Sequence, residues 1–276
     1  MEATLRTDNV LREAMGAVAV TDALGFKAAR RRVGPGKLVE SVQVTRGAAA
    51  HQARLHYISH GAITHVEAIS DLIIIATLEK HNRDHQVETT MQTAVSVVAA
   101  ACSALFDPVR TRLTLLAYRG CIAVGDLAMS ADIFIGSSID EAAEFSEQAD
   151  AAVVWLTPSA REALEPVGDK MLVLEWTVPL KNRGGFDALV VNPFYQCVFE
   201  AVGKDGEPTL IHCMDLLESR LIDTFGSTPP VDVAYKLQQT AAFLREARHH
   251  TMKVFPEWKD AYLAEQAAKR EGDGNA

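Results

Sequence analysis

The chain has 276 residues, of which 48% are hydrophobic, so it can form a sizeable globular core and is not a disordered protein. It carries 27 lysines and arginines against 36 aspartates and glutamates. The resulting net charge of -9 argues against nonspecific attraction to nucleic acid or to an anionic membrane. A polyanionic substrate would therefore have to be held locally, by cations or by backbone amides.

Three features of the sequence bear on the cellular compartment of the protein. The N-terminal segment is charged and has no basic region followed by an apolar one, which predicts that no signal peptide is present. The longest nearly apolar run, TAVSVVAAACSALF, is too short to span a bilayer. The cysteines form no CxxC pair and fall in apolar surroundings, which favours reduced core residues over disulfides or zinc ligands. We therefore expect a cytoplasmic protein.

The first half of the chain alternates predicted strands and helices. Residues 18–21 predict a strand, followed by a turn at DALGF and a basic helix, KAARRRV, that ends at GPG. The segment AAAHQARLHYISHGAITHVEAIS mixes helical and extended signals. DLIIIATLE, rich in β-branched residues, predicts a buried strand, and a long apolar helix should end before Pro108. LTLLAYRGCIAVGDLAM predicts a strand with a glycine where another backbone can approach closely.

The second half continues this pattern. DIFIGSSIDEAAEFSEQADA and AVVWLTPSAREAL each predict a short strand, a turn and a helix, and MLVLEWTVPL and FDALVVNPF predict further strands. The Asp-Gly pair in GKDGEP predicts a hairpin turn, and AYKLQQTAAFLREARHHTMKVF an amphipathic helix. This order indicates an α/β sandwich. Because no flexible linker is visible, we expect residues 1–170 to form the main domain and residues 171–276 to pack on it.

Two lone aspartates stand beside the apolar strand candidates. Asp22 precedes a glycine turn that leads into a helix, where the backbone amides of Leu24, Gly25 and Phe26 can cradle phosphate while the carboxylate binds a cation. Asp71 opens the most apolar strand. A turn or helix cap explains Asp22 alone, and a solvated strand end explains Asp71 alone. Together, if adjacent in a sheet, they can bridge two Mg²⁺ ions about 3.5–4 Å apart.

The motifs around these aspartates resemble those of one enzyme family. VTDALGF resembles the first-strand motif of class III nucleotidyl cyclases, and VEAISDLIII is similar to the hairpin that carries their second metal aspartate. YRGCIAVGDL, IFIGSSIDEAAEF and VVWLTPSA look like later stretches of that family, in the same order. The resemblance runs from Val18 to Ala160 and implies a class III cyclase-like catalytic domain. Its fold would be a ferredoxin-like core, with a mixed, largely antiparallel sheet covered by helices.

The resemblance also implies residue roles. Asp22 and Asp71 would be the catalytic carboxylates that hold two Mg²⁺ or Mn²⁺ ions, with the carbonyl of Ala23 as a further metal ligand. A nucleoside triphosphate would be converted to its 3′,5′-cyclic monophosphate and pyrophosphate. The active sites would be shared between the two subunits of a head-to-tail homodimer. Three consecutive residues would contact the triphosphate: Leu24, Gly25 and Phe26.

The chain departs from the family on one helix. The family carries a transition-state Asn and Arg there, and this chain has Asp140 and Glu144 at those places. Carboxylates cannot donate hydrogen bonds to a phosphorane, and loss of one preorganised donor typically costs about 10²–10³ in rate. Arg119, Lys181 and Arg183 are available cations. The sequence does not choose among them.

The residues at the base-binding positions also depart from the family. Glu67 stands where adenylate cyclases carry Lys and guanylate cyclases carry Glu, and Ile133 stands where those enzymes carry Asp or Cys. The purine-recognising pair is therefore incomplete. Cytosine N4 and uracil N3 both offer an N–H donor to a carboxylate, so Glu67 does not demand guanine. A solvated charge on a strand face is an equally good interpretation of Glu67.

A narrower resemblance accounts for both departures. RGxIxxG and EAxE without the Asn/Arg pair, followed by VPLK…VVNPF and AYKLQQTAAFL, look like the stand-alone bacterial cyclases of the pyrimidine cyclase system for antiphage resistance. That resemblance implies cyclic UMP or cyclic CMP, with UTP favoured over CTP, acting on a separate effector protein. The alternative is a catalytically inactive, cyclase-like domain that binds nucleotide or regulates a partner. Asp140 and Glu144 favour the alternative, and retention of both Asp22 and Asp71 favours the enzyme.

Overall fold

One mixed sheet runs through the computed structural model, which describes residues 12–60, 62–79, 90–109, 116–130, 133–164, 169–181, 184–225 and 229–273. The strand order is β2-β3-β1-β4-β6-β8-β7, and β5 pairs with β4 beside this path. The pair β4 and β6 is parallel, and the other pairs are antiparallel. The strands are β1 (Arg12–Leu24), β2 (Ile63–Ile69), β3 (Leu72–Leu78), β4 (Ala117–Ser130), β5 (Ile133–Ile135), β6 (Val154–Leu156), β7 (Val173–Leu180) and β8 (Gly184–Val191).

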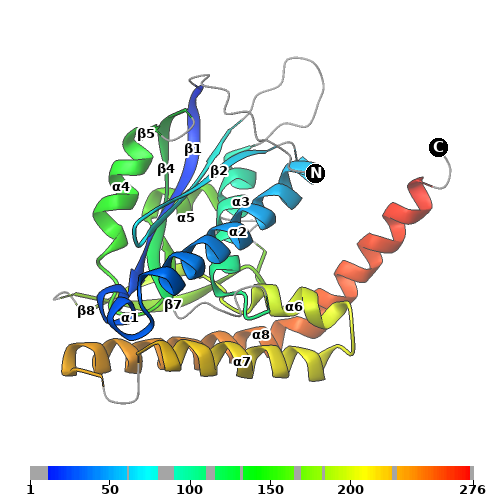
Figure 1. Ribbon diagram of the computed structural model, residues 1–276. Coiled ribbons are helices and arrows are strands. Elements are labelled where there is room, and N and C mark those ends of the chain that lie inside the picture. Colours follow the sequence, from blue (N-terminus) through cyan, green and yellow to red (C-terminus); the bar gives the residue numbers. More distant parts are fainter. Residues whose placement is uncertain are drawn as a thin grey trace.

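Helices cover both faces of this sheet, with α4 on one side and α2 and α3 on the other (Figure 1). This arrangement confirms the predicted α/β sandwich. In the described ranges, none of the helices combines the length and hydrophobicity needed to cross a membrane. The helices are α1 (Phe26–Val33), α2 (Pro35–His60), α3 (Met91–Ser103), the short 3₁₀ helix η1 (Ala104–Phe106), α4 (Ser137–Ser146), α5 (Pro158–Leu164), α6 (Tyr195–Val202), α7 (Glu207–Phe225) and α8 (Val231–Asp273).

The first half of the chain forms a ferredoxin-like core, as predicted. Its elements β1, α2, β2, β3, α3 and β4 follow one another along the chain, and the strands stand in the antiparallel order β2-β3-β1-β4. The central strand β1 is longer than the predicted residues 18–21, so Asp22 lies inside the strand. Helices cover β1 on both faces, which explains its continuous apolar run.

A tight hairpin joins β2 to β3. Its two loop residues are Ser70 and Asp71, and Ser70 has a positive φ of 61°. Two-residue hairpins require such left-handed backbone because it matches the twist of the flanking strands. The predicted strand DLIIIATLE is therefore confirmed as β3, and Asp71 lies in the turn immediately before it.

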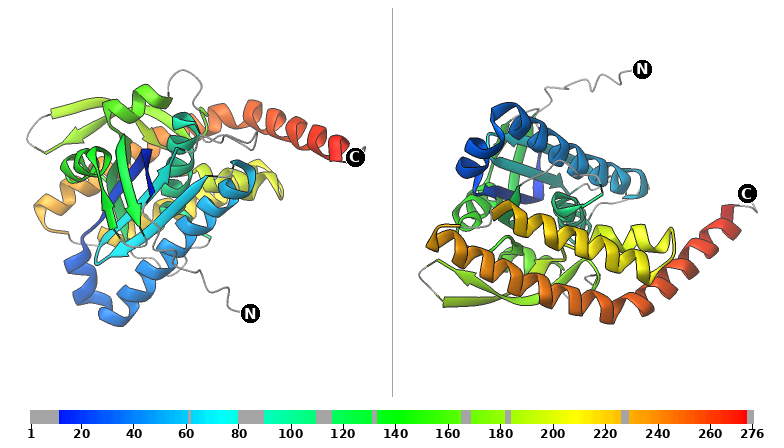
Figure 2. Two further views of the ribbon diagram at one scale, coloured as in Figure 1. Left: turned by 90° about the horizontal axis from the view of Figure 1, so that it is seen from above. Right: turned by 60° about the horizontal axis from the view of Figure 1, so that its bottom comes forward.

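The last third of the chain extends the same sheet and adds two long helices. Strands β7 and β8 continue the sheet beyond β6. Helix α8 is tied to the body by its threonines: Ala152 N donates to Thr240 Oγ1 at 2.9 Å, and Asn192 Nδ2 donates to Thr251 Oγ1 at 2.9 Å. Helices α7 and α8 lie side by side, and the C-terminal part of α8 extends away from the body (Figure 2). The division into residues 1–170 and 171–276 stays a prediction.

The structure corrects one local prediction and resolves one ambiguous segment. GKDGEP does not form a β-hairpin, because it joins α6 to α7. The segment with mixed signals divides into the end of α2 and the edge strand β2. Residues 113–115 of the expected strand before β4 lie outside the described residues. All four cysteines are buried, as predicted.

Candidate active site

The structure brings the two predicted aspartates together. Asp22 pairs with Leu72 in the ladder between β1 and β3, and the Ala23 amide donates to the Asp71 carbonyl oxygen at 3.0 Å. The carbonyl of Ala23 leaves the strand on the same side as its amide, toward the hairpin. Burial is the main reason that the pKa of Tyr118 lies above its ordinary value, and the nearby Asp71 raises this pKa further. The two residues are therefore neighbours in the sheet, which is the condition that a shared cation site requires, and their roles as metal ligands stay predictions.

The turn after β1 places the N-terminus of α1 next to the aspartates. Gly25 has φ 71° and ψ 16°, a left-handed conformation that glycine adopts without a steric cost, and it is the N-cap residue of α1. It offers no side chain to the first amides of the helix, which have no partner within a helix. Phe26 opens α1 and packs partly against the core. Leu24, the last residue of β1, pairs with Ala117 of β4, so strand pairing competes with phosphate for the Leu24 amide.

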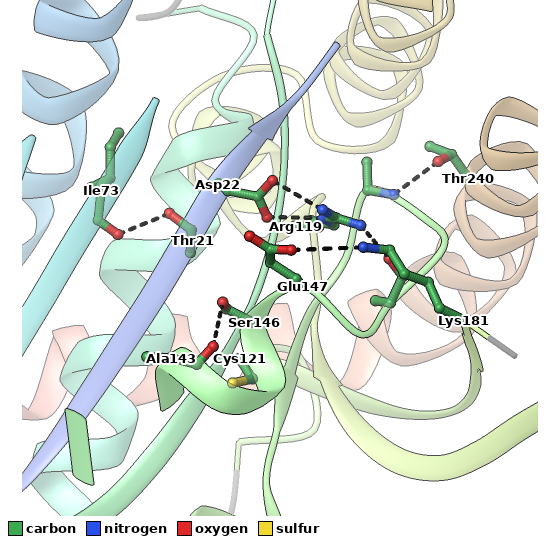
Figure 3. A network of polar contacts seen from close by, with 12 residues as sticks. Thr21, Asp22, Ile73, Arg119, Cys121, Ala143, Ser146, Glu147, Lys181 and Thr240 are labelled. Carbon is green, nitrogen blue, oxygen red and sulfur yellow. Dashed lines mark hydrogen bonds and ion pairs between the residues drawn. The ribbon is translucent and has the colours of Figure 1, made fainter. Parts of the chain in front are cut away.

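Asp22 has a partner that the sequence did not reveal (Figure 3). Arg119 Nε donates to Asp22 Oδ1 at 2.9 Å, and Arg119 Nη2 donates to Asp22 Oδ2 at 3.2 Å. Arg119 Nη1 also donates to the Ala149 carbonyl at 2.9 Å. The side chains of Arg119 and Asp22 are only 8% and 14% exposed. The two residues are direct cross-strand partners in the ladder between β1 and β4.

This ion pair explains how a carboxylate can remain charged at the end of a buried strand. A buried charge needs a partner of opposite sign, and a bidentate guanidinium satisfies both carboxylate oxygens. The sequence contained a signal for it. Arg119 is the one cation of β4, and Asp22 is an anion at the end of the apolar run of β1, but their pairing depends on a register between residues far apart in sequence.

The other candidate cations are less well placed. Lys181 Nζ lies 3.8 Å from Glu147 Oε2, and both side chains are well exposed (Figure 3). Such surface pairs contribute little to stability, typically between zero and about 1 kcal/mol. Arg183 lies outside the described residues. Among the described candidates, Arg119 is therefore the cation that contacts a predicted site residue.

The predicted base-binding residues lie on two strands, β2 and β5, that do not pair with each other. Glu67, on β2, accepts from Arg46 Nη2 at 3.0 and 3.1 Å, and both side chains are partly exposed. Ile133, on β5, is 56% exposed and pairs with Ser130 at the end of β4. The roles of Glu67 and Ile133 stay predictions.

The acidic residues that replace the family's transition-state pair lie on the exposed surface of α4. Asp140 is in the first turn of this helix, where a negative charge suits the helix dipole, and Glu144 follows one turn later. Both residues are exposed. Neither can donate a hydrogen bond while ionised, so α4 does not supply the expected donors.

The residues at the ends of β1 and β3 fit a divalent cation whose coordination is completed by a substrate. Mg²⁺ is usually bound through one or two carboxylates together with substrate phosphates, and Asp22, Asp71 and the Ala23 carbonyl are oxygen ligands of that kind. In the part of the chain that the structure describes, no group of three or more His, Cys, Asp or Glu residues could hold a metal ion by itself.

Comparison with solved structures finds nucleotide cyclases. The adenylyl cyclase CyaB from P. aeruginosa is 11% identical, covering 66% of this chain and 95% of its own, with a TM-score of 0.44. The guanylate cyclase domain of RhGC from Catenaria anguillulae, solved with GTP, is 12% identical over 65% of this chain and 97% of its own, with a TM-score of 0.42. A bacterial light-regulated adenylyl cyclase is 10% identical over 66% and 92%, with a TM-score of 0.41.

No protein-family model matches the chain, and no curated protein sequence matches it either. At the identities and TM-scores found for the solved structures, the resemblance assigns neither a substrate nor an activity to this chain. The function is therefore argued from the residues at the ends of β1 and β3.

Proposed function

We propose that this protein is a metal-dependent nucleotidyl cyclase that converts a pyrimidine nucleoside triphosphate to its 3′,5′-cyclic monophosphate. The observation that carries the proposal is the adjacency of Asp22 and Asp71 at one end of the central strands, beside the Gly25 turn. Two aspartates beside the first amides of a helix suit a cation and a polyphosphate together. Following the motif resemblance, UTP is favoured over CTP, and the product acts on a separate effector in antiphage defence.

The chain's own residues would chiefly position the substrate. Asp22, Asp71 and the Ala23 carbonyl would hold Mg²⁺ or Mn²⁺, two ions per site, and the amides of Gly25 and Phe26 would bind phosphate oxygens. Bound divalent cations lower the pKa of a hydroxyl and neutralise the leaving phosphate oxygens. The ribose 3′ oxygen bonds to the α-phosphorus, the bond from that phosphorus to the bridging oxygen breaks, pyrophosphate leaves, and the hydroxyl proton passes to solvent. Orientation of these atoms supplies much of the rate.

The positions of the two predicted subsites support a shared site in a homodimer. Arg119 pairs with Asp22 near the start of β4, and Ser130 pairs with Ile133 at its end. The strand between these two points is roughly 35 Å long at about 3.4 Å per residue. A nucleotide held at Asp22 would have to extend along most of β4 to reach Ile133 of the same chain. We therefore propose a head-to-tail dimer in which Ile133 of one subunit faces the aspartates of the other.

One observation favours the alternative, a cyclase-like domain that binds nucleotide without turnover. Asp22 is already neutralised by Arg119, so the ion pair alone explains why a carboxylate lies in this strand. The exposed Asp140 and Glu144 are anions at the two places on α4 where the family carries donors. The two functions differ in whether Asp71 is needed for product formation, since Asp71 takes no part in the ion pair.

Replacing Asp71 with asparagine tests the proposal directly. The side chain keeps its size and its turn preference, so we expect stability to change by less than about 0.5 kcal/mol. Loss of a metal carboxylate should lower product formation at least about 100-fold. Loss of a residue that only orients a metal ligand typically lowers activity by about 10- to 100-fold, so the expected effect is larger. The measurement is the rate of cyclic nucleotide release with Mn²⁺.

Asp126→Asn is the matched control, because Asp126 is an exposed aspartate on β4, away from the Asp22 end of that strand. Its product formation should equal that of the unmodified chain. Full activity in Asp71→Asn would contradict the metal assignment and leave the noncatalytic domain as the better account.

A further inference from the structure

Helix α1 follows the Gly25 turn, so its direction sets where the first helical amides point. Among its side chains that the structure describes, Ala29 is buried, and Phe26 and Val33 pack partly against the core. Its last turn carries three exposed arginines, Arg30, Arg31 and Arg32. Helices shorter than about 12–15 residues are marginal on their own in water, and α1 has eight residues. It therefore keeps its direction through contacts with other elements.

Arg32 connects α1 to the end of α7, a helix from the last third of the chain (Figure 1). Arg32 Nη1 donates to the Asp223 carbonyl at 3.2 Å, and Arg32 Nη2 donates to the Thr224 carbonyl at 3.4 Å. The last four carbonyls of a helix have no partner within that helix, and they carry the negative end of its dipole. Arg32 is thus a C-terminal cap of α7 that is supplied by α1.

The end of α7 is itself fixed to the body of the protein. Leu217 and Leu221, in the second half of this helix, are buried in the core. Arg220 Nη1 donates to the carbonyl of Pro108, which follows η1 in the first half of the chain. Close-packed interiors resist displacement, so a helix end held in this way is a rigid support. Arg32 therefore ties a weakly packed helix to a well-packed one.

The two ends of α1 have different attachments. Its first residue follows Gly25 at the end of β1, and its last turn holds Arg32 against α7. The helix is continuous from Phe26 to Val33 and roughly 12 Å long at 1.5 Å per residue. A short rigid rod that is held at both ends resists pivoting about the Gly25 turn. Because small displacements of groups that orient a substrate weaken their effect strongly, the far attachment matters at the near end.

We propose that Arg32 is a positioning residue: by capping α7 it holds α1, and with it the amides of Gly25 and Phe26, in place for the triphosphate. This inference rests on the proposed function. It gives the C-terminal helices a part in substrate binding, because α7 fixes the far end of the helix whose near end meets the phosphates. In this role Arg32 does not contact the substrate and acts through α1.

Hydrogen exchange and ligand affinity, both measured on the full chain, test this role. In Arg32→Gln the amides at the start of α1 should exchange about three- to fivefold faster than in the unmodified protein, the size expected for loss of a charged contact at a helix end. Affinity for the α,β-methylene analogue of UTP in the presence of Mn²⁺, measured by calorimetry, should fall by a similar factor. This analogue cannot be cyclised, so no turnover is needed. The midpoint of thermal unfolding should change little, because the contact is exposed.

Arg31→Gln is the matched control. Arg31 is exposed in the same turn, and among the described residues no hydrogen bond joins its side chain to α7. The substitution removes the same charge from the same helix, so it accounts for any long-range attraction between the basic helix and the nucleotide. It should leave the exchange rates unchanged and weaken analogue binding less than Arg32→Gln. Arg32→Lys keeps a charged donor at the end of α7 and should restore part of the difference.

Three outcomes would overturn the positioning role of Arg32 alone. These are equal exchange at the start of α1 in Arg31→Gln and Arg32→Gln, an equal loss of analogue affinity in both variants, or a large fall in the unfolding midpoint of Arg32→Gln, which would show that the contact supports the fold as a whole. Absence of analogue binding in every form, including the unmodified chain, would instead overturn the proposed function and, with it, the role of Arg32 in substrate binding.

Discussion

Replacing Asp22 with asparagine should destabilise the protein by about 3–5 kcal/mol, because Arg119 would then be a buried charge without a counter-ion. The same change should abolish cyclic nucleotide formation, since it removes a metal ligand. Urea denaturation followed by circular dichroism measures the first effect, and product release measures the second. A large loss of both is the expected result.

The two effects can be separated with a second substitution. In Asp22→Asn combined with Arg119→Met, neither partner of the ion pair is charged, and replacing both members of a buried pair by uncharged groups is often nearly neutral. We expect most of the stability to return while activity stays absent. If the double variant regained product formation, Asp22 would act only through the ion pair, and its role as a metal ligand would be wrong.

Gly120→Ala should have the other large effect, through the backbone beside the same pair. A Cβ at Gly120 would lie 2.2 Å from the Val20 carbonyl oxygen and 2.7 Å from Thr21 Cα. Both are main-chain atoms of β1, so β1 and β4 would have to separate next to the Asp22 position. Overpacking of a rigid core costs typically 1–3 kcal/mol, and we expect about 3 kcal/mol or more here. Product formation should fall with stability, because the register that aligns Arg119 with Asp22 is disturbed.

Gly203→Ala is the control for this prediction. Gly203 has an ordinary φ of -74°, and the nearest atom to its added Cβ is 3.6 Å away. This substitution should be neutral or stabilise by about 0.4–1 kcal/mol by restricting the unfolded chain. Thermal unfolding of both variants makes the comparison. Equal stability of the two variants would show that the close approach of β1 to β4 at Gly120 is not required.

Local patterns were sufficient to predict much of the fold. DLIIIATLE is β-branched and bounded by charge, and it forms β3. The glycine after the first strand has the left-handed backbone that a turn into α1 needs. GKDGEP was misinterpreted because Asp-Gly turn chemistry is local and does not report which elements flank it, here α6 and α7. Turn residues alone cannot distinguish a hairpin from a link between helices.

Part of the candidate site could also be predicted from the sequence, and part could not. The two aspartates stood out in the sequence because each lies beside an apolar run, and the order of the motifs resembles that of one family. The partner of Asp22 could not be predicted, because the pairing of Arg119 with it follows from a register set by packing over the whole of β1 and β4. The sequence identified Arg119 as a cation of interest and left it equal to Lys181. Only the distances choose between them.

The measurement that tests the central claim most directly is incubation of the purified full chain with Mn²⁺ or Mg²⁺ and each of ATP, GTP, CTP and UTP separately. Cyclic monophosphates are detected by mass. The proposed function predicts a cyclic pyrimidine product, most from UTP, which is absent in Asp71→Asn and absent without the metal. No cyclic product from any of the four nucleotides, or a product that persists in Asp71→Asn, would contradict it.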